Sequence, residues 1–519
     1  MVVGDISKRN AKLYPGRVGL SFEGKDFTFR VFNDRVNRLA NVFLQLGLNK
    51  GDRVGILEHS CPEYIELYYA TAKSGTVIVP INSRLSRDEV VFILRDCGAK
   101  TLILGGDFIE MIRSTRQDLE SLQHILLLGE EKIEGFESFS RLTSDAPEIE
   151  PNVDVEESDL AMIMYTSGVT GRPKGVMTTH KNMMANTVNQ TLELDIRYGD
   201  ITLLVMPLYH NGGLWPHLTH FYRGGKVILL RRFDEQTCLE IIEKEKVTLF
   251  NVVPVMIMRL LDYPGLDNYN IDSLRSIFCA GSPTPAPVMR KSLEFFGKRI
   301  MTGLGMTEAS GGILFHQRED LYLGVTDDKK ELLTSVGKDA INVETRIVNE
   351  QGEDVKPGEV GEIIAKGDNI TVGYWNLPDD TAKTYRNGWL YSGDLVTKDE
   401  DGYVYVVDRA KDIIISGGEN ISSKEVEDVI YSCPGVLEAT VIGIPDEKWG
   451  EAVHAVVVPK RGTILKEEDI VEHCKKRLAS YKKPKSVEFV DALPRNFFGK
   501  VEKNRLKDKF WKGYEKRVH

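Results

Sequence analysis

A glycine-rich loop at residues 165–176 carries the strongest chemical signal in this chain of 519 residues. It reads Tyr165-Thr-Ser-Gly-Val-Thr-Gly-Arg-Pro-Lys-Gly-Val176. Its backbone N–H groups, three hydroxyls and single lysine suit a polyphosphate. Two residues separate its first two glycines, and Lys174 is followed by Gly175 rather than by Ser or Thr, so the loop is not a Walker A sequence. A flexible turn is the alternative interpretation, and the length of the string argues against it.

Six further segments follow the loop in the sequence. They are Pro207-Leu-Tyr-His210, Gly303-Leu-Gly-Met-Thr-Glu308, Tyr391-Ser-Gly-Asp394, Asp408-Arg-Ala-Lys-Asp412, Ser416-Gly-Gly-Glu-Asn420 and Pro494-Arg-Asn-Phe-Phe-Gly-Lys500. In this order they resemble the motifs of the adenylate-forming (ANL) superfamily, which contains acyl-CoA synthetases, peptide-synthetase adenylation domains and luciferases. The resemblance extends over essentially the whole chain.

The resemblance implies a ligase that works in two steps. A carboxylate first attacks the α-phosphorus of ATP and releases pyrophosphate, and the thiol of CoA then takes the acyl group from the acyl-adenylate. Lys500 is implied to bind the α-phosphate and the acid's carboxylate, and Lys174 the outer phosphates. Mg²⁺ is the implied cofactor, held by Glu308 and Thr166, and His210 is implied to gate the acyl pocket.

The resemblance also implies which residues contact the nucleotide. The ribose hydroxyls would bind Asp394 and Arg409, and Val406 would pack under the nucleoside. The implied set is Thr166, Ser167, Gly168, Thr170, Gly171, Lys174, Gly281, Ser282, Pro283, Gly303, Leu304, Gly305, Met306, Thr307, Asp394, Val406, Arg409 and Lys500. Leu304 stands where most relatives place Tyr or Phe, so we expect a weaker contact with adenine.

The acyl and CoA sites are implied in the same way. The acyl pocket would be lined by His210, Asn211, Gly212, Gly213, Val253, Ala280, Gly281 and Gly303, together with Gly311–Ile313. CoA would contact Gly417, Gly418, Glu419, Trp449, Tyr481 and Lys483 after the small domain rotates about a hinge at Lys411. The pocket positions contain no acidic or basic group other than the gate histidine, and their glycines are expected to leave room for a medium- to long-chain fatty acid.

Three alternatives to a fatty acyl-CoA synthetase remain open. An aryl-CoA ligase of the benzoate or hydroxycinnamate type fits the same neutral pocket. A carrier-protein-loading adenylation enzyme is less favoured, because Asn211–Leu214 supplies no carboxylate for an amino-acid substrate. A catalytically silent nucleotide-binding regulator is disfavoured because both Glu308 and Lys500 are present. A metal site at His210, His217 and His220 lacks an acidic or cysteine partner and is not predicted.

The elements that must position these residues alternate between strand and helix patterns. Apolar strand patterns at 53–57, 76–79 and 101–104 alternate with helical ones, and a similar alternation returns over 201–301, which predicts two helix-covered, largely parallel sheets. Short strands with turn signals after about residue 335 predict a small β region. A capping box at Ser422–Glu425 begins a helix of a small α+β domain.

The expected fold class is therefore a large α/β N-terminal domain followed by a small, mobile α+β C-terminal domain. The predicted limits are 1–408 for the AMP- and acyl-binding domain, 409–412 for the hinge, and 413–519 for the domain with the catalytic lysine.

Composition excludes several classes of protein. A net charge of −10, from 67 basic and 77 acidic residues, argues against a nucleic-acid binder. No apolar run is long enough to cross a membrane, and the N-terminus does not resemble a secretory signal, so a cytoplasmic location is expected. Six widely spaced cysteines are expected to be reduced. The expected partners are ATP, CoA and a carboxylic acid, and an oligomer is possible.

Overall fold

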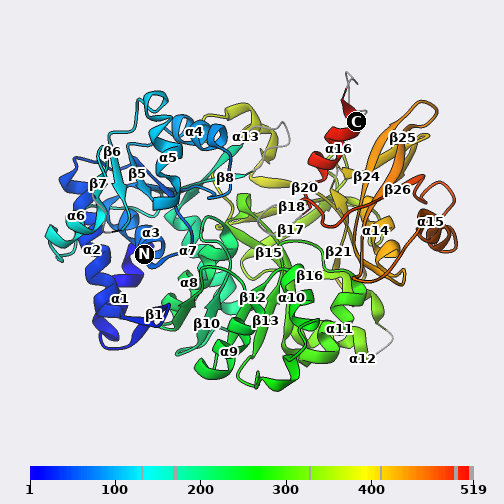
Figure 1. The fold of residues 1–519 in the computed structure, drawn as a ribbon, viewed down its shortest axis with the longest axis horizontal. Coiled ribbons are helices and arrows are strands. Elements are labelled where there is room, and N and C mark those ends of the chain that lie inside the picture. Colours follow the sequence, from blue (N-terminus) through cyan, green and yellow to red (C-terminus); the bar gives the residue numbers. More distant parts are fainter. Residues whose placement is uncertain (130–132, 167–172, 327–328, 410–411, 496–500, 513–519) are drawn as a thin grey trace.

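The computed structural model describes residues 1–129, 133–166, 173–326, 329–409, 412–495 and 501–512 and arranges their strands in three sheets (Figure 1). The expected large α/β domain followed by a small C-terminal domain is confirmed, and the mobility of the small domain stays a prediction.

The N-terminal lobe, blue to cyan in Figure 1, is built on a sheet of seven described strands. Their order is β7 (Glu137–Ser138), β6 (His124–Leu127), β5 (Thr101–Leu104), β3 (Arg53–Leu57), β4 (Val77–Pro80), β8 (Leu160–Thr166) and β9 (Lys174–Thr179). The predicted strands at 53–57 and 101–104 have the predicted bounds. Strand β9 pairs antiparallel with β8, so the two strands flank the glycine-rich loop.

A second sheet of fourteen described strands extends from the middle lobe. Its order is β17 (Val343–Val348), β18 (Gly361–Gly367), β20 (Trp389–Lys398), β21 (Val404–Arg409), β16 (Ser335–Asp339), β15 (Gly311–His316), β14 (Ile300–Met306), β13 (Ser276–Cys279), β12 (Leu249–Val252), β10 (Ile201–Leu204), β11 (Lys226–Leu229), β1 (Val18–Phe22) and β2 (Lys25–Thr28), and β19 (Tyr385–Arg386) pairs with β20. The small β region predicted after residue 335 continues this sheet, because β16 pairs with β15.

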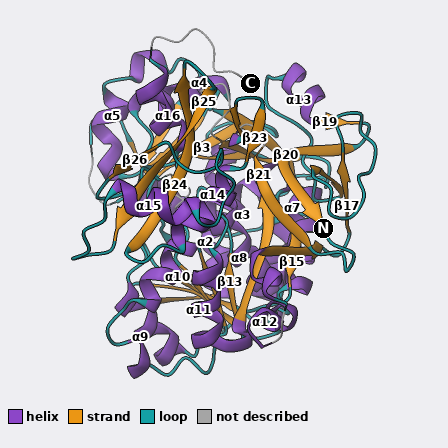
Figure 2. Ribbon diagram, turned by 90° about the vertical axis from the view of Figure 1, so that its right-hand side faces the viewer, coloured by secondary structure: helices purple, strands orange, loops and turns teal. Residues whose placement is uncertain are grey.

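Helices pack against the three sheets, and the last three described helices pack on the C-terminal one (Figures 1 and 2). In the described residues they are α1 (Gly4–Leu13), α2 (Phe29–Gln45), α3 (Pro62–Ser74), α4 (Arg87–Asp96), α5 (Ile109–Arg113), α6 (Phe139–Asp145), α7 (His180–Glu193), α8 (Asn211–Tyr222), α9 (Glu235–Glu245), α10 (Pro254–Leu261), α11 (Ala286–Phe296), α12 (Arg318–Thr326), α13 (Pro378–Thr384), α14 (Ser423–Tyr431), α15 (Glu467–Lys475) and α16 (Lys503–Trp511). Among them, none has both the length and the hydrophobicity to cross a membrane. The cytoplasmic location stays a prediction.

The two large sheets share one core. Buried side chains of α2, α3 and α8, such as Phe43, Tyr69 and Phe221, pack in the same cluster as Val54 from the first sheet and Leu229 from the second. Burying aromatic side chains of this size is strongly stabilising. The two lobes are therefore held together as one body, and segments from both can contribute to one site.

The C-terminal part forms a third sheet. Its order is β23 (Glu419–Ile421), β22 (Ile414–Ser416), β25 (Gly450–Pro459) and β24 (Val436–Asp446), and β26 (Ser486–Phe489) pairs with β25. Strand β21 of the second sheet ends at Arg409, and β22 of the third begins at Ile414. The hydroxyl of Ser422 accepts the N–H of Glu425, as in the predicted capping box, but the Glu425 carboxylate pairs with Lys482 instead of closing the box.

Two contacts join the second sheet to α14 across this change of sheet. The buried carboxylate of Asp408 accepts the backbone N–H of Ser423 at 2.6 Å and its hydroxyl at 2.7 Å. The Ser422 hydroxyl donates to the carbonyl of Val407 at 2.8 Å. A carboxylate in this place satisfies free N–H groups and opposes the positive end of the helix dipole. Asp408 therefore fixes the first turn of α14 to the end of β21.

Candidate active site

The segments assigned to acid and adenine follow neighbouring parallel strands of the second sheet. Strands β10, β12, β13 and β14 pair in parallel, and their carboxyl ends lead to four such segments. Three of them, Pro207–His210, Val253 and Ala280–Pro283, follow their strands, and the fourth, Gly303–Thr307, comprises the carboxyl-terminal half of β14 and the residue after it. In α/β sheets, ligands bind outside the carboxyl ends of the strands. The topology therefore collects these predicted residues at one edge.

Half-buried apolar side chains form a floor beside these segments. Ala280, Leu304, Met306 and Val406 all pack against the same buried cluster, although they come from three parts of the chain. Leu304 faces Leu314 across the β14–β15 pair. One buried cluster thus supports all four side chains. Three of them are predicted to lie near the nucleoside and one in the acyl pocket.

The phosphate end of the site is organised by Tyr374. The Lys174 ammonium lies 5.1 Å from the centre of the Tyr374 ring, and the Tyr374 hydroxyl donates to Glu308 Oε1 at 2.9 Å. Burial, and then the charge of Glu308, raise the pKa of Tyr374, so its hydroxyl stays protonated and remains a donor. One tyrosine thereby holds a cation over its ring and a carboxylate at its hydroxyl.

A neighbouring carboxylate neutralises Lys174. Asp380 of α13 lies 3.3 Å from the Lys174 ammonium. Backbone bonds hold the nearby segment in place, since Trp375 donates to the carbonyl of Gly175 at 2.7 Å and Met177 to that of Gly373 at 2.9 Å. The phosphate-loop lysine is thus paired with an acidic group that an incoming polyphosphate could replace.

Asp394 and Arg409 lie directly opposite each other on β20 and β21. The guanidinium Nε is 3.1 Å from the buried carboxylate, and the guanidinium itself is partly exposed. A carboxylate can accept a hydrogen bond from one hydroxyl, and a guanidinium beside it can donate to the neighbouring hydroxyl. This arrangement suits the two hydroxyls of a ribose.

The glycines of the predicted acyl pocket fall into two groups. A Cβ at Gly213 would lie 2.2 Å from the carbonyl oxygen of Pro207, one at Gly303 would lie 2.5 Å from that of Leu314, and one at Gly312 would lie 2.5 Å from the Phe315 ring. These three glycines permit close packing of the protein against itself and do not leave room for an acyl chain. A Cβ at Gly212 or Gly281 would come no closer than 3.4 Å to another residue. The expected room for a long acyl chain therefore stays a prediction for these two positions.

The three histidines do not form a metal site, and among the described residues there is no group of three ligands that could hold a metal ion. The Nδ1 atom of His217 lies 3.2 Å from the Tyr69 hydroxyl, and burial lowers the pKa of His217 to about 3. Burial also lowers the pKa of His220 to about 4, and that of His210 well below its usual value. All three rings are neutral at pH 7.

Two of the residues assigned to CoA, Gly417 and Trp449, contact each other. Gly417 donates its N–H to the carbonyl of Trp449, and a Cβ at Gly417 would lie 2.7 Å from the indole ring. The next residue, Gly418, has φ of +86° and faces open space. Trp449 and Tyr481 are both exposed, with Glu419 exposed and Lys483 half-buried. The surface is therefore open where the pantetheine arm was predicted to pass.

Several predicted residues lie outside the described residues. They are Ser167, Gly168, Thr170, Gly171, Lys411 and Lys500. Their roles stay predictions.

The sequence analysis missed Tyr374, Asp380 and Asp96. Asp96 accepts the Tyr165 hydroxyl and, through its carbonyl, the indole N–H of Trp375, so it joins the start of the loop to the 374–376 segment. The aromatic pair Tyr374-Trp375 shortly before the acidic pair Asp379-Asp380 was a signal in the sequence. No spacing rule relates them to Lys174, because the contact is formed by chain segments about 200 residues apart.

Comparison with known proteins agrees with this geometry. Residues 7–375 match the AMP-binding enzyme family, and residues 425–500 match the AMP-binding enzyme C-terminal domain. A feruloyl-CoA synthase from Amycolatopsis sp is 37% identical, covering 98% of this chain and 99% of the relative. The long-chain-fatty-acid–CoA ligase FadD13 of Mycobacterium tuberculosis is 35% identical, covering 93% of each chain.

Among solved structures, ATP-bound MatB from Rhodopseudomonas palustris superposes with a TM-score of 0.89 at 30% identity, covering 99% of this chain and 100% of that one. The chain therefore belongs to the AMP-binding enzymes of the adenylate-forming superfamily and is of the acyl-CoA synthetase type.

Proposed function

We propose that this protein activates a neutral carboxylic acid with ATP and transfers the acyl group to CoA. The observation that carries the proposal is the arrangement in which Tyr374 links Lys174 to Glu308, beside the strand ends that present the acid and adenine segments. Relatives named as feruloyl-CoA and long-chain fatty acyl-CoA ligases support it, and both acid types remain candidates.

In the first step, the protein must stabilise charge that develops around the phosphates. Lys174 exchanges Asp380 for the outer phosphates, and Lys500 neutralises the α-phosphate as the carboxylate attacks it. Asp394 and Arg409 orient the ribose. A preorganised electrostatic contact of this kind typically contributes about 2.7–4 kcal/mol to transition-state stabilisation.

Glu308 and Thr166 fit the demands of Mg²⁺. They supply oxygen ligands, and the hydroxyl of Tyr374 orients the Glu308 carboxylate by binding one of its two oxygens. Mg²⁺ usually takes only one or two protein ligands beside phosphate oxygens and water. When bound, the ion would neutralise phosphate charge, and the role of these residues is to place it.

In the second step, the small domain would rotate about residues 409–412 and bring Gly417 and Gly418 to the acyl-adenylate. The open surface at Gly418 supports a path for the pantetheine arm. Such a rotation would have to break the contacts of Asp408 with α14.

The decisive test is a panel of acids assayed for AMP release with and without CoA. The panel contains acetate, linear acids from butyrate to palmitate, benzoate, cinnamate and several amino acids. We expect ATP-dependent AMP release that requires a neutral acid and CoA and yields the acyl-CoA. Turnover that requires an amino acid, or a phosphopantetheinylated carrier protein in place of CoA, would contradict the proposal.

A further inference from the structure

Three amide side chains near the predicted acyl site are buried with unused hydrogen-bonding atoms. Gln190 on α7 is 2% exposed and Asn251 on β12 is 4% exposed. Within the described part of the chain, Gln190 Oε1, both amide atoms of Asn251 and both amide atoms of Asn211 have no hydrogen-bond partner. Buried amides without partners are costly, so their retention needs an explanation.

Gln190 and its neighbour Asn186 lie over the β14–β15 turn. The Gln190 amide donates to Asn186 Oδ1 at 3.0 Å. A Cβ at Gly311 would lie 2.6 Å from Asn186 Oδ1 and 2.6 Å from Gln190 Nε2. Gly311 belongs to the segment assigned to the acyl pocket, so both amides border that pocket.

Asn251 and Asn211 border the same region from the other side. Asn251 is paired with Phe278 in the parallel sheet, so the two side chains point to the same face. Phe278 stacks on Phe315, with ring centres 5.6 Å apart, and meets Trp215 edge-on at 5.8 Å.

Trp215 lies one helical turn after Asn211 on α8, so these two side chains share a helix face. The Phe315 ring in turn lies against Gly312, which follows Gly311. Asn251 and Asn211 therefore adjoin one aromatic cluster, and the Gly311–Gly312 segment links Gln190 to it.

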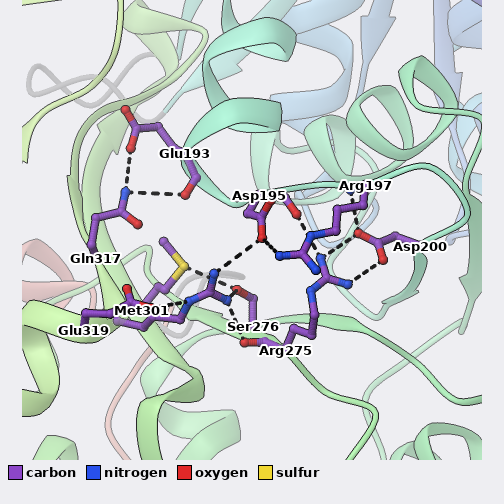
Figure 3. A network of polar contacts seen from close by, with 10 residues as sticks. Glu193, Asp195, Arg197, Asp200, Arg275, Ser276, Met301, Gln317 and Glu319 are labelled. Carbon is purple, nitrogen blue, oxygen red and sulfur yellow. Dashed lines mark hydrogen bonds and ion pairs between the residues drawn. The ribbon is translucent and has the colours of Figure 1, made fainter.

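The helix that carries Gln190 is fixed in position at its C-terminal end. There, Glu193 accepts a hydrogen bond from the Gln317 amide at 2.6 Å (Figure 3). It also accepts one from the backbone N–H of Ile341 at 2.7 Å. Just beyond, Arg275 forms two bonds to Asp200, at 2.6 and 2.8 Å. This network ties the end of α7 to the second sheet, so the helix is not free to shift and bring Gln190 to another partner.

We propose that Gln190 and Asn251 read a hydrogen-bonding substituent on the acid, and that the substrate is a hydroxylated aromatic acid. The inference rests on the proposed function and deepens it. A phenolic hydroxyl can donate to an amide oxygen and accept from an amide N–H, and its ring suits the aromatic cluster. A saturated chain would bury against the amides and leave them unpaired. A site built to bind a hydroxyl discriminates strongly against the analogue that lacks it.

The test compares acids that differ by a single hydroxyl. The measured quantity is kcat/KM for 4-hydroxycinnamate against cinnamate, and for 8-hydroxyoctanoate against octanoate. For the natural enzyme we expect 4-hydroxycinnamate to exceed both cinnamate and every linear acid by at least about tenfold. In Gln190→Met and Asn251→Leu, the preference for 4-hydroxycinnamate over cinnamate should fall at least about fivefold, chiefly through loss of the hydroxylated acid.

Asn189→Leu is the matched control. Asn189 is a buried amide on the same helix with an unused Nδ2, but its Oδ1 accepts from Asn342, near β17. This variant should keep the natural preference even if its melting temperature falls. An equal change of preference in Asn189→Leu would assign the effect to the helix as a whole and overturn the inference.

Other outcomes are also decisive. Linear acids that improve with each added carbon and exceed 4-hydroxycinnamate would overturn the hydroxyaryl assignment while leaving the acyl-CoA synthetase intact. An unchanged preference in both variants would show that water, not substrate, satisfies the amides. If the variants do not fold, the natural enzyme's ratios decide alone. If neither aromatic nor linear acids cause AMP release, the result would count against the proposed function itself.

Discussion

The predicted nucleotide end and the predicted acyl end of this site treat their polar side chains differently. Where the phosphates are predicted, Lys174 pairs with Asp380 and Glu308 accepts from Tyr374, and where the ribose is predicted, Arg409 pairs with Asp394. At the acyl end, the neutral amides of Gln190 and Asn251 keep unused atoms in the described structure.

The difference follows from the cost of burial. An unpaired buried charge is far more costly than an unpaired amide, so charged groups need a partner even before ligand binds. The charged side chains would therefore exchange one partner for another when the nucleotide binds. The neutral amides would gain hydrogen-bond partners only when the acid binds.

The largest effect is expected from a substitution that removes the cation predicted to bind the α-phosphate. Lys500→Ala should lower the rate of adenylate formation on the order of 100-fold or more, because charge at the α-phosphate is left without its partner. Thioester formation from supplied acyl-adenylate should be largely retained. Single-turnover assays of each half-reaction measure this, and equal losses in both would refute a role confined to the first step.

Gly418→Leu should separate the two half-reactions in the opposite direction. Pyrophosphate exchange should persist, and CoA-dependent turnover should fall about 10- to 100-fold, because a side chain at φ +86° would enter the open path. Gly462→Leu is the control, since Gly462 has φ of +79°, faces open space and lies in the same part of the chain. Similar turnover in the two variants would exclude the pantetheine path at Gly418.

Leu304→Tyr tests whether adenine binds beside Leu304. Leu304 lies on the apolar floor with Met306, and an aromatic ring there could stack on adenine for roughly 0.5–1.5 kcal/mol. The apparent KM for ATP should fall about 2- to 10-fold, as measured by initial rates. A rise in this KM with an unchanged melting temperature would place adenine elsewhere.

The smallest effect is expected from a substitution that tests whether phosphate replaces Asp380 as the partner of Lys174. Asp380→Asn should release Lys174 from a partly exposed ion pair and lower the apparent KM for ATP about 1.5- to 5-fold. Asp379→Asn, one residue earlier, should leave it unchanged. A higher KM in Asp380→Asn would mean that Asp380 positions Lys174 rather than competing with phosphate.

Sequence patterns predicted elements well where the signal is local. The strands at 53–57 and 101–104 were found because each depends on residues close together in the chain. The continuation of the second sheet through β16 could not be predicted, because strand pairing across long separations leaves no local pattern.

The same limit applies to the site. Motifs identified Lys174, Glu308, Asp394 and Arg409, which the structure places in two groups of contacts. Tyr374 was missed because its role arises only when the 372–375 segment lies beside β9. The sequence analysis expected the glycines to leave space in the acyl pocket. Only the structure shows which atoms already occupy the space next to each glycine.

The bonds of Asp408 to the first turn of α14 have a consequence for the populations of domain orientations. They join the second sheet to the C-terminal part only in the orientation described here. An N-cap bond of this kind contributes about 0.5–2 kcal/mol, which corresponds to a bias of roughly 2- to 30-fold toward that orientation. If the small domain rotates as proposed, a ligand that favours another orientation must supply at least this difference in affinity, and Asp408 would then raise the substrate concentration that turnover requires.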